Sequence, residues 1–264
     1  MQVSQNLFRL DGKIALIAGA ASGIGQAAAH GLAGAGALAI CADVNVAGAE
    51  QTAETIRREG GQAEALGLNI TDQAGVTAAV TGIQEEHARI DVLVCTPAVN
   101  VRKRLLNYSG AEFDKVINLN LKGTFLITQA VARLMDANRA GSIILFSSIR
   151  SVNVEPGQGV YAATKAGLVQ LARALAAELG PSGVRVNCIA PGIVETPLTA
   201  QIKNSPAWYD AYAQRNALGR WARADEMAGP VVFLASDAAS YVTGAVLFVD
   251  GGWTAIDGRF TPPV

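Results

Sequence analysis

Three side chains in the second half of the sequence have the types and spacing needed to move a proton. Tyr161 and Lys165 lie four positions apart at the start of a predicted helix, so they share one face of it. A lysine ammonium near a tyrosine hydroxyl favours the phenolate and lowers its pKa, so the tyrosine can exchange protons nearer neutral pH. Ser148 follows a predicted strand, and ligands bind at the ends of parallel strands. Without Ser148, a half-buried tyrosine and a surface lysine would be the ordinary interpretation of the Tyr/Lys pair.

A second group of residues has the pattern of a dinucleotide site. The turn Gly19-Ala20-Ala21-Ser22-Gly23-Ile24-Gly25 joins the first predicted strand to a helix. Glycine lets the backbone approach a pyrophosphate, and the helix N-terminus offers free N–H groups to the anion. Asp43 ends the next predicted strand 18 residues beyond Gly25, close to the ~20-residue spacing of a ribose-binding carboxylate. A structural turn and a solvated acid are the alternative interpretation.

Asp43 also predicts which dinucleotide binds. A carboxylate there accepts hydrogen bonds from the ribose hydroxyls and repels a 2′-phosphate. Neither the glycine turn nor residues 44–46 contain Lys or Arg. The expected cofactor is therefore NAD(H) rather than NADP(H).

Short apolar segments alternate with longer helical patterns along the chain. The candidate strands are Lys13–Gly19, Ala37–Ala42, Gln62–Leu68, Asp91–Cys95, Gly141–Ser147, Val184–Ala190 and Ala245–Val249. The candidate helices between them include Gly23–Ala33, Ala47–Glu59, Asp72–His87, Ser109–Ala137, Tyr161–Leu179 and Ala224–Ala235. Several strands are apolar throughout, as parallel strands covered on both faces are. The pattern predicts an α/β fold: a Rossmann-type, doubly wound parallel sheet of about seven strands with helices on both faces.

No linker divides the chain, so we expect one domain over residues 1–264. The least regular interior segment runs from Pro191 to about Arg220 and has three prolines and an aromatic cluster. In α/β enzymes such segments often cover a site. We therefore expect a mobile substrate loop near residues 193–220.

Composition excludes several classes of protein. Half of the 264 residues are apolar and the net charge is -1, which argues against disorder and nucleic-acid binding. No apolar run approaches the ~18 residues of a membrane span. With only His30 and His87 and no closely spaced cysteines, we expect no metal site. Cys41, Cys95 and Cys188 each lie in an apolar run, which fits reduced, buried thiols and a cytoplasmic protein.

Taken together, these features resemble the short-chain dehydrogenase/reductase family from about Leu10 to Gly252. The residues that carry the resemblance are Gly19, Gly23, Gly25, Asp43, Asn120-Leu121-Lys122-Gly123, Ser148, Tyr161, Lys165, Pro191-Gly192, Thr196 and Asp250-Gly251-Gly252. In this order and spacing they are highly specific, although each is modest alone.

The resemblance implies a catalytic set of four residues. Tyr161 would be the acid/base, and Ser148 would hydrogen-bond the substrate oxygen. Lys165 would hold the nicotinamide ribose and lower the pKa of Tyr161. Asn120 would position a water in a proton relay through Lys165.

The resemblance also implies a cofactor site. Thr196 would lie near the nicotinamide carboxamide, with the Ile193 backbone on the ring edge. The full expected set is Gly19, Ser22, Gly23, Ile24, Gly25, Asp43, Asn69, Ile70, Ala98, Tyr161, Lys165, Pro191, Gly192, Ile193 and Thr196.

Three positions depart from the family pattern. Ala18 stands where the family has Thr, and Cys95-Thr96-Pro97-Ala98 replaces Asn-Asn-Ala-Gly. Because those two family elements contact each other, we expect a repacked contact rather than a broken one. Ala98 adds a methyl group near the cofactor path. Asn69 replaces an adenine-contacting Asp, and its carbonyl can still accept a hydrogen bond.

The substrate must be argued separately, because the family is diverse. Arg150 could pair with a carboxylate or bind several hydroxyls, or it could be a surface loop residue. Gln158 adds polar capacity, whereas Glu155 disfavours a bulky anion unless it pairs with Arg150. Trp208 on the predicted loop would either stack on substrate or pack. We predict an NAD(H)-dependent oxidoreductase that interconverts a secondary alcohol and a ketone on a small polar substrate, such as a polyol, sugar or hydroxy acid.

Two alternatives remain at this stage. A 3-oxoacyl-thioester reductase fits the same motifs, but reductive biosynthesis more often uses NADPH and Asp43 counts against that cofactor. A non-enzymatic dinucleotide-binding regulator would have a damaged catalytic set, whereas the four residues are all present here.

The predicted helix Tyr161–Leu179 is apolar around most of its circumference, which indicates burial on more than one side. One face would pack on the sheet and another on a second subunit, and the family resemblance implies a homotetramer. The C-terminal extension, residues 253–264, ends in Thr-Pro-Pro-Val. It would either reach a neighbouring subunit or be disordered.

Overall fold

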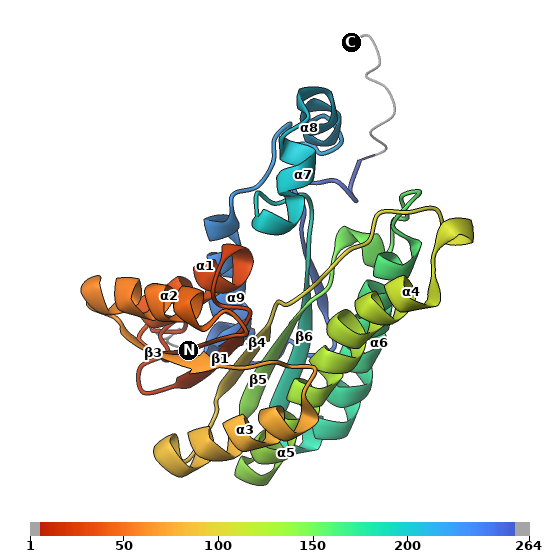
Figure 1. The fold of residues 1–264 in the computed structure, drawn as a ribbon. Helices are drawn as coiled ribbons and strands as arrows, with labels where there is room; N and C mark the ends of the chain where they lie inside the picture. The colour runs from red at the N-terminus through yellow and green to blue at the C-terminus, as the bar shows by residue number, and fades with distance from the viewer. Residues whose placement is uncertain (1–5, 257–264) are drawn as a thin grey trace.

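A seven-stranded parallel sheet runs through the centre of the protein in the computed structural model, which describes residues 6–256 (Figure 1). Its strands are β1 (Ile14–Ala18), β2 (Leu38–Asp43), β3 (Gln62–Gly67), β4 (Val92–Cys95), β5 (Gly141–Phe146), β6 (Val184–Pro191) and β7 (Val246–Val249). The order is β3-β2-β1-β4-β5-β6-β7, and each neighbouring pair is parallel. All seven expected strands are confirmed, each end within one residue of its predicted position.

The strand order reverses between β1 and β4, which makes this the switch point where α/β sheets bind ligands. The burial pattern of β1 shows why the central strands of the sheet are apolar. Successive residues of β1 enter opposite hydrophobic cores, Ala15 and Ile17 one core and Leu16 and Ala18 the other. A strand buried on both faces must be apolar throughout, as the sequence of β1 is.

Helices cover both faces of the sheet. One core lies under α1 (Gly23–Gly34), α2 (Val46–Arg58) and α9 (Ala228–Ala235). The other lies under α3 (Gln73–His87), α5 (Thr124–Asn138) and α6 (Gly159–Leu179). This is the predicted doubly wound arrangement. No helix within residues 6–256 has the length and apolar character needed to cross a bilayer.

The predicted helix Ser109–Ala137 is wrong as a single element. It divides into α4 (Gly110–Ile117), a π-helical segment (Asn118–Gly123) and α5. The amide of Asn120 bonds both backbone polar groups of Val99, which ties the widened turn to the loop after β4. π-helical turns often occur at functional sites, and this one places Asn120 in the interior. The predicted helix 224–235 likewise begins with a 3₁₀ turn (Ala224–Met227) before α9.

The segment between β6 and α9 extends beyond the carboxyl ends of the strands (Figure 1). It contains two short helices, α7 (Ala200–Lys203) and α8 (Pro206–Ala213). A third, small hydrophobic core holds it: Ile149, Ile202, Tyr212, Ala213, Trp221 and Trp253. We call residues 193–220 the substrate loop. The predicted tail contact falls mostly on residues 257–264, which lie outside the described residues.

Candidate active site

The glycine turn after β1 leaves room for an anion at the start of α1. Gly19 and Gly23 have φ angles of +89° and +56°, which side-chain-bearing residues rarely adopt. A Cβ on Gly25 would lie 2.0 Å from the Gly19 carbonyl oxygen. The Ser22 side chain makes no capping hydrogen bond, so the first-turn N–H groups of α1 stay available. The turn therefore fits a pyrophosphate group.

This turn forms one wall of a cavity of about 350 Å³ at the switch point of the sheet. Ten of the predicted cofactor residues line it: Gly19, Ser22, Gly23, Ile24, Gly25, Asp43, Asn69, Ile70, Ala98 and Thr196. Of the remaining five, Tyr161, Gly192 and Ile193 line a neighbouring cavity, whereas Lys165 and Pro191 line neither. Among the described residues that line the larger cavity, Asp43 is the single charged one.

Asp43 and Asn69, the two side chains predicted to contact the adenosine of the cofactor, are both held by hydrogen bonds within the protein. Asp43 Oδ2 accepts a hydrogen bond from the Ala21 N–H at 3.1 Å, and Oδ1 accepts one from the Asn45 N–H at 2.8 Å. These bonds fix the carboxylate against the glycine turn. Asn69 Oδ1 accepts from both the N–H and the hydroxyl of Thr71, at 3.0 and 2.8 Å, so its oxygen is already occupied.

The expected repacking around the glycine turn is confirmed. Thr96 Oγ1 donates a hydrogen bond to the Ala18 carbonyl oxygen at 2.9 Å. The hydroxyl absent from position 18 on β1 is thus supplied by Thr96, which follows β4. The contact between the two strand ends is preserved although both family motifs have changed.

The smaller, neighbouring cavity measures about 110 Å³ and contains the predicted catalytic hydroxyls of Ser148 and Tyr161. Leu198 of the substrate loop lines both cavities, so they adjoin. The other lining residues are Asn100, Arg102, Ile149, Arg150, Gln158, Gly192, Ile193, Thr199, Gln201, Ile202 and Tyr212. Two of the three predicted substrate residues, Arg150 and Gln158, are therefore at this cavity.

Lys165 and Asn120 lie behind Tyr161, in the interior. Lys165 is 2% exposed, its Nζ donates to the Phe146 carbonyl oxygen at 2.7 Å, and Nζ lies 5.5 Å from the centre of the Tyr161 ring. Besides its two bonds to Val99, the Asn120 amide donates to Thr164 Oγ1 at 3.3 Å. The Asn120 side chain thus holds the loop after β4, and its predicted role with water stays a prediction.

Burial and charge act in opposite directions on Tyr161. Burial raises the pKa of Tyr161 to about 12, while a hydrogen bond with Ser148 and the charges of Arg150 and Arg102 act to lower it. Ser148 and the two arginines therefore oppose the rise, and the lowering expected from Lys165 stays a prediction. Burial also lowers the pKa of Lys165, to about 8.

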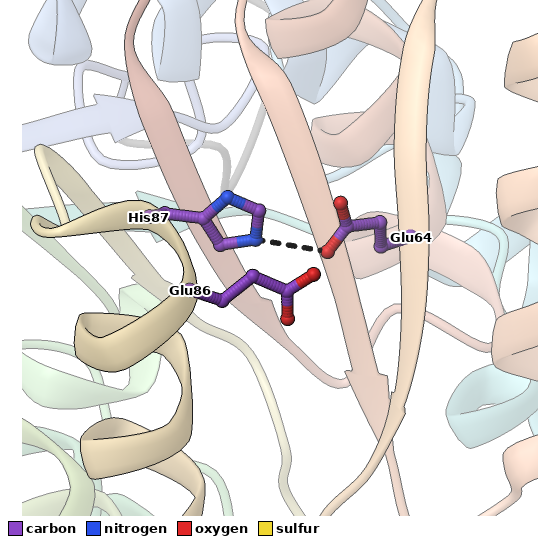
Figure 2. Close-up of side chains that lie close together, drawn as sticks. All are labelled: Glu64, Glu86 and His87. Carbon is purple, nitrogen blue, oxygen red and sulfur yellow. Dashed lines mark hydrogen bonds and ion pairs between the residues drawn. The ribbon is translucent and has the colours of Figure 1, made fainter.

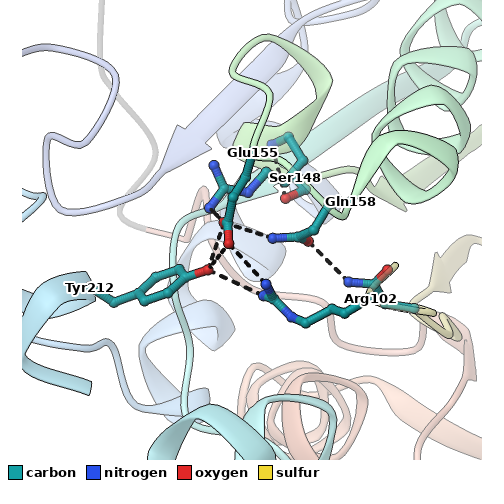
Figure 3. A network of polar contacts seen from close by, with 7 residues as sticks. Arg102, Ser148, Glu155, Gln158 and Tyr212 are labelled. Carbon is teal, nitrogen blue, oxygen red and sulfur yellow. Dashed lines mark hydrogen bonds and ion pairs between the residues drawn. The ribbon is translucent and has the colours of Figure 1, made fainter. Parts of the chain in front are cut away.

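A polar network surrounds Glu155 at the wall of the smaller cavity (Figure 3). Arg102 Nη1 donates to Glu155 at 2.9 Å, and Arg150 Nη2 forms a close ion pair with the same carboxylate. The Tyr212 hydroxyl donates to it at 2.6 Å, and Gln158 Nε2 at 2.7 Å. We call these residues, with Asn100 bonded to Gln158 Oε1, the Glu155 network.

The contacts of the Glu155 network test several predictions about the wall of the smaller cavity. Arg150 is buried, so the surface-loop interpretation is wrong, and its pairing with Glu155 is confirmed. Trp208 does not line the cavity; its ring is 37% exposed and lies 5.2 Å from the Arg102 guanidinium, so it packs on an arginine instead. Arg102 and Asn100 were not predicted. Arg102 and Glu155 are 53 positions apart, and no sequence pattern connects them.

One group of possible metal ligands lies elsewhere, among the described residues. Glu64, Glu86 and His87 have ligand atoms within 4.8 Å of one another (Figure 2). His87 Nε2 already pairs with Glu64 Oε2 at 3.0 Å. Glu86 and His87 end α3, which places the group near the amino end of the sheet, away from both cavities. We assign it no role in the site.

Comparison with known proteins supports the features of this site. A family model described as enoyl-(acyl carrier protein) reductase matches residues 19–254. The chain belongs to the short-chain dehydrogenase/reductase family. Members of this family with about this similarity act on several kinds of substrate.

Two curated members and one solved structure illustrate that range. D-threitol dehydrogenase of Mycolicibacterium smegmatis is 40% identical over 94% of this chain and 95% of its own. A 3-oxoacyl-[acyl-carrier-protein] reductase of Thermotoga maritima is 38% identical over 92% of this chain and 98% of its own. The crystal structure of a gluconate 5-dehydrogenase from Burkholderia cenocepacia, in complex with NADP and tartrate, has a TM-score of 0.91 at 36% identity and covers 95% of this chain and 98% of that one.

The protein is therefore an oxidoreductase of the short-chain family that acts on a CH–OH group with a nicotinamide dinucleotide. The larger cavity, lined by the glycine turn and Asp43, fits such a cofactor. The residues around the two cavities determine which dinucleotide and which alcohol the protein uses.

Proposed function

We propose that the protein is an NAD(H)-dependent dehydrogenase that interconverts a secondary alcohol and a ketone on a small polar substrate: a polyol, a sugar or a hydroxy acid. The observation that carries this proposal is the small cavity itself. Ser148 and Tyr161 line it together with Arg102, Arg150 and Gln158, and it adjoins the larger cavity. The relatives named for threitol and gluconate support the same class of substrate.

The preference for NAD(H) rests on Asp43. Its carboxylate is the single charge among the described lining residues of the larger cavity, and two backbone N–H groups hold it in place. A 2′-phosphate at the adenosine ribose would be repelled by this carboxylate and would find no lining Lys or Arg. The related gluconate 5-dehydrogenase was crystallised with NADP, so this preference needs a direct test.

The residues can divide the chemistry in a simple way. When bound, the nicotinamide ring supplies the hydride acceptor or donor. Tyr161, at the cavity wall, takes the alcohol proton during oxidation and returns it during reduction. The backbone N–H of Arg150 donates a hydrogen bond to Ser148 Oγ at 3.1 Å. This bond fixes the serine hydroxyl beside Tyr161, where it would hold the substrate oxygen. In this proposal Lys165, whose Nζ lies 5.5 Å from the centre of the Tyr161 ring, would hold the nicotinamide ribose.

A 3-oxoacyl-thioester reductase is the second candidate. The relative from Thermotoga maritima and the matching family model favour it. The charged and amide side chains of the smaller cavity and its volume of about 110 Å³ suit a short polar molecule better than an acyl chain. Reduction of an acetoacetyl thioester with NADPH tests this candidate directly.

The experiment is a substrate screen that follows NADH absorbance. Polyols, aldoses and hydroxy acids are offered with NAD and, in parallel, with NADP. We expect oxidation with NAD, loss of it in Tyr161→Phe, and a rise of about tenfold or more in the NADP/NAD activity ratio for Asp43→Asn.

Three results would contradict the proposal in different ways. Equal or better activity with NADP would overturn the role of Asp43. Activity on thioesters alone would select the second candidate. Tight NAD binding without turnover of any substrate would indicate a regulator rather than an enzyme.

A further inference from the structure

The Glu155 network contains one more positive charge than negative charge. Arg102 and Arg150 both pair with the single carboxylate of Glu155, and the other members of the network are neutral. The Arg150 side chain is 9% exposed, and those of Arg102 and Glu155 are 23% exposed. An uncompensated charge so far removed from water is unfavourable, so an anionic ligand would be stabilised here.

Glu155 itself stays ionised. It already contributes its full negative charge, so it cannot neutralise the second arginine as well. Burial pushes its pKa upward, but the Tyr212 hydrogen bond and the two arginines outweigh it and hold the pKa below its usual value. Its carboxylate therefore counts as one full negative charge at neutral pH. That charge is divided between two guanidinium groups.

Arg150 is the arginine with donors to spare. Its Nη2 pairs with Glu155, and neither Nε nor Nη1 is among the buried nitrogen atoms that lack a partner in residues 6–256. Nη1 and the second hydrogen of Nη2 together form the end of the guanidinium. Arg150 lines the same cavity as Ser148 and Tyr161. The Trp253 ring, 5.4 Å from the guanidinium carbon, holds its plane.

Arg102 is committed to the substrate loop instead. Its Nη1 bonds Glu155, its Nη2 donates to the Tyr212 hydroxyl at 3.2 Å, and its guanidinium lies over the ring of Trp208. It therefore holds α8 against the cavity wall. The charge available to a ligand belongs mainly to Arg150.

We infer that the guanidinium of Arg150 binds a carboxylate of the substrate, which makes the substrate a hydroxy acid, and that Glu155 weakens this binding by drawing on the same guanidinium. The inference deepens the proposed function and rests on it. A planar guanidinium edge matches a carboxylate with two parallel hydrogen bonds. The cavity of about 110 Å³ also limits the substrate to a short chain between the carboxylate and the reacting carbon.

The test compares each hydroxy acid with its own primary amide, which has nearly the same shape and no charge. The pairs are lactate and lactamide, 3-hydroxybutyrate and 3-hydroxybutyramide, and gluconate and gluconamide, each oxidised with NAD by the full chain. The readout is the ratio of kcat/KM for acid to that for amide. Effects of a variant on Tyr161 or on the cofactor act on both members of a pair and cancel in this ratio.

For the best pair we expect the wild-type ratio to exceed one. Arg150→Met should lower it about 10- to 100-fold, mainly through KM of the acid, and Arg150→Lys should retain part of it. Glu155→Gln should raise it several-fold, because the Arg150 guanidinium is then no longer neutralised by a second carboxylate. Arg104→Met is the matched control, since Arg104 is exposed and lines neither cavity.

The opposite directions expected for the two substitutions separate this inference from misfolding, which could not raise the ratio. An equal loss on acid and amide in Arg150→Met, or an unchanged or lowered ratio in Glu155→Gln, would overturn it. Oxidation of neutral polyols with no acid oxidised would overturn this inference and leave the proposed function standing. Oxidation of no alcohol at all would overturn both.

Discussion

At the scale of single residues, Tyr161 shows how this site sets its chemistry. Burial raises its pKa to about 12, and Ser148, Arg150 and Arg102 oppose that rise. The phenolate form is needed to accept a proton from an alcohol, whereas the protonated form donates to a ketone. The two directions of the reaction should therefore respond to pH in opposite ways.

The pH profile of alcohol oxidation tests this. We expect the rate at saturating cofactor to rise with pH on the alkaline side of neutrality, because Tyr161 must lose its proton. Arg150→Met removes a positive charge that lowers the Tyr161 pKa, so its midpoint should move to higher pH. Arg104→Met should leave the midpoint unchanged. A midpoint for Arg150→Met at or below the wild-type value would show that Arg150 does not act on Tyr161.

At the scale of elements, the turn between β1 and α1 tolerates no extra atoms. A Cβ on Gly25 would meet both the Gly19 carbonyl oxygen and Thr96 Oγ1, the hydroxyl that ties β4 to β1. Backbone cannot move aside as a flexible side chain can. The same helix ends at Gly34, where nothing lies within 4 Å of an added Cβ.

Gly25 and Gly34 of α1 therefore form a matched pair. Gly25→Ala should raise the Kd for NADH at least about tenfold and lower the free energy of unfolding by about 1–3 kcal/mol. Gly34→Ala should leave NADH affinity unchanged and alter stability by less than about 1 kcal/mol, in the stabilising direction. NADH fluorescence titration and urea unfolding measure both quantities. Equal effects of the two substitutions would show that the turn does not depend on close backbone contact.

At the scale of the whole molecule, the single chain leaves large apolar side chains exposed. Leu105, Leu106, Phe113 and Phe125 come from the segment 105–107 and from α4 and α5. Exposed apolar surface of this kind is typical of protein interfaces. α6 also keeps Ala163, Ala174 and Ala177 exposed, as expected if a second face of this helix meets another subunit.

The predicted homotetramer can be tested by light scattering. We expect a mass four times the 27.3 kDa of the chain at micromolar concentration. Phe125→Asp should lower that mass, because a buried, unpaired carboxylate at an interface is unfavourable. A wild-type mass equal to one chain would contradict the prediction.

The sequence by itself determined the sheet and the glycine turn. Apolar runs that must be buried on both faces indicated all seven strands to within one residue. The spacing of Gly19, Gly25 and Asp43 indicated the larger cavity, and ten of its predicted residues line it. These features follow from short segments and from the order of strands, so a local pattern records them.

Only the tertiary structure determined which residues form the wall of the smaller cavity. Arg102 meets Glu155 across 53 positions and Tyr212 across 110, from loops whose paths no periodicity determines. Thr96 likewise takes over a hydrogen bond that the family makes from the other strand, and Asn120 draws its helix into a π-turn. The net charge around Arg150 depends on contacts between residues that are far apart in the sequence. Packing brings them together because a buried charge must find its partners wherever the fold places them.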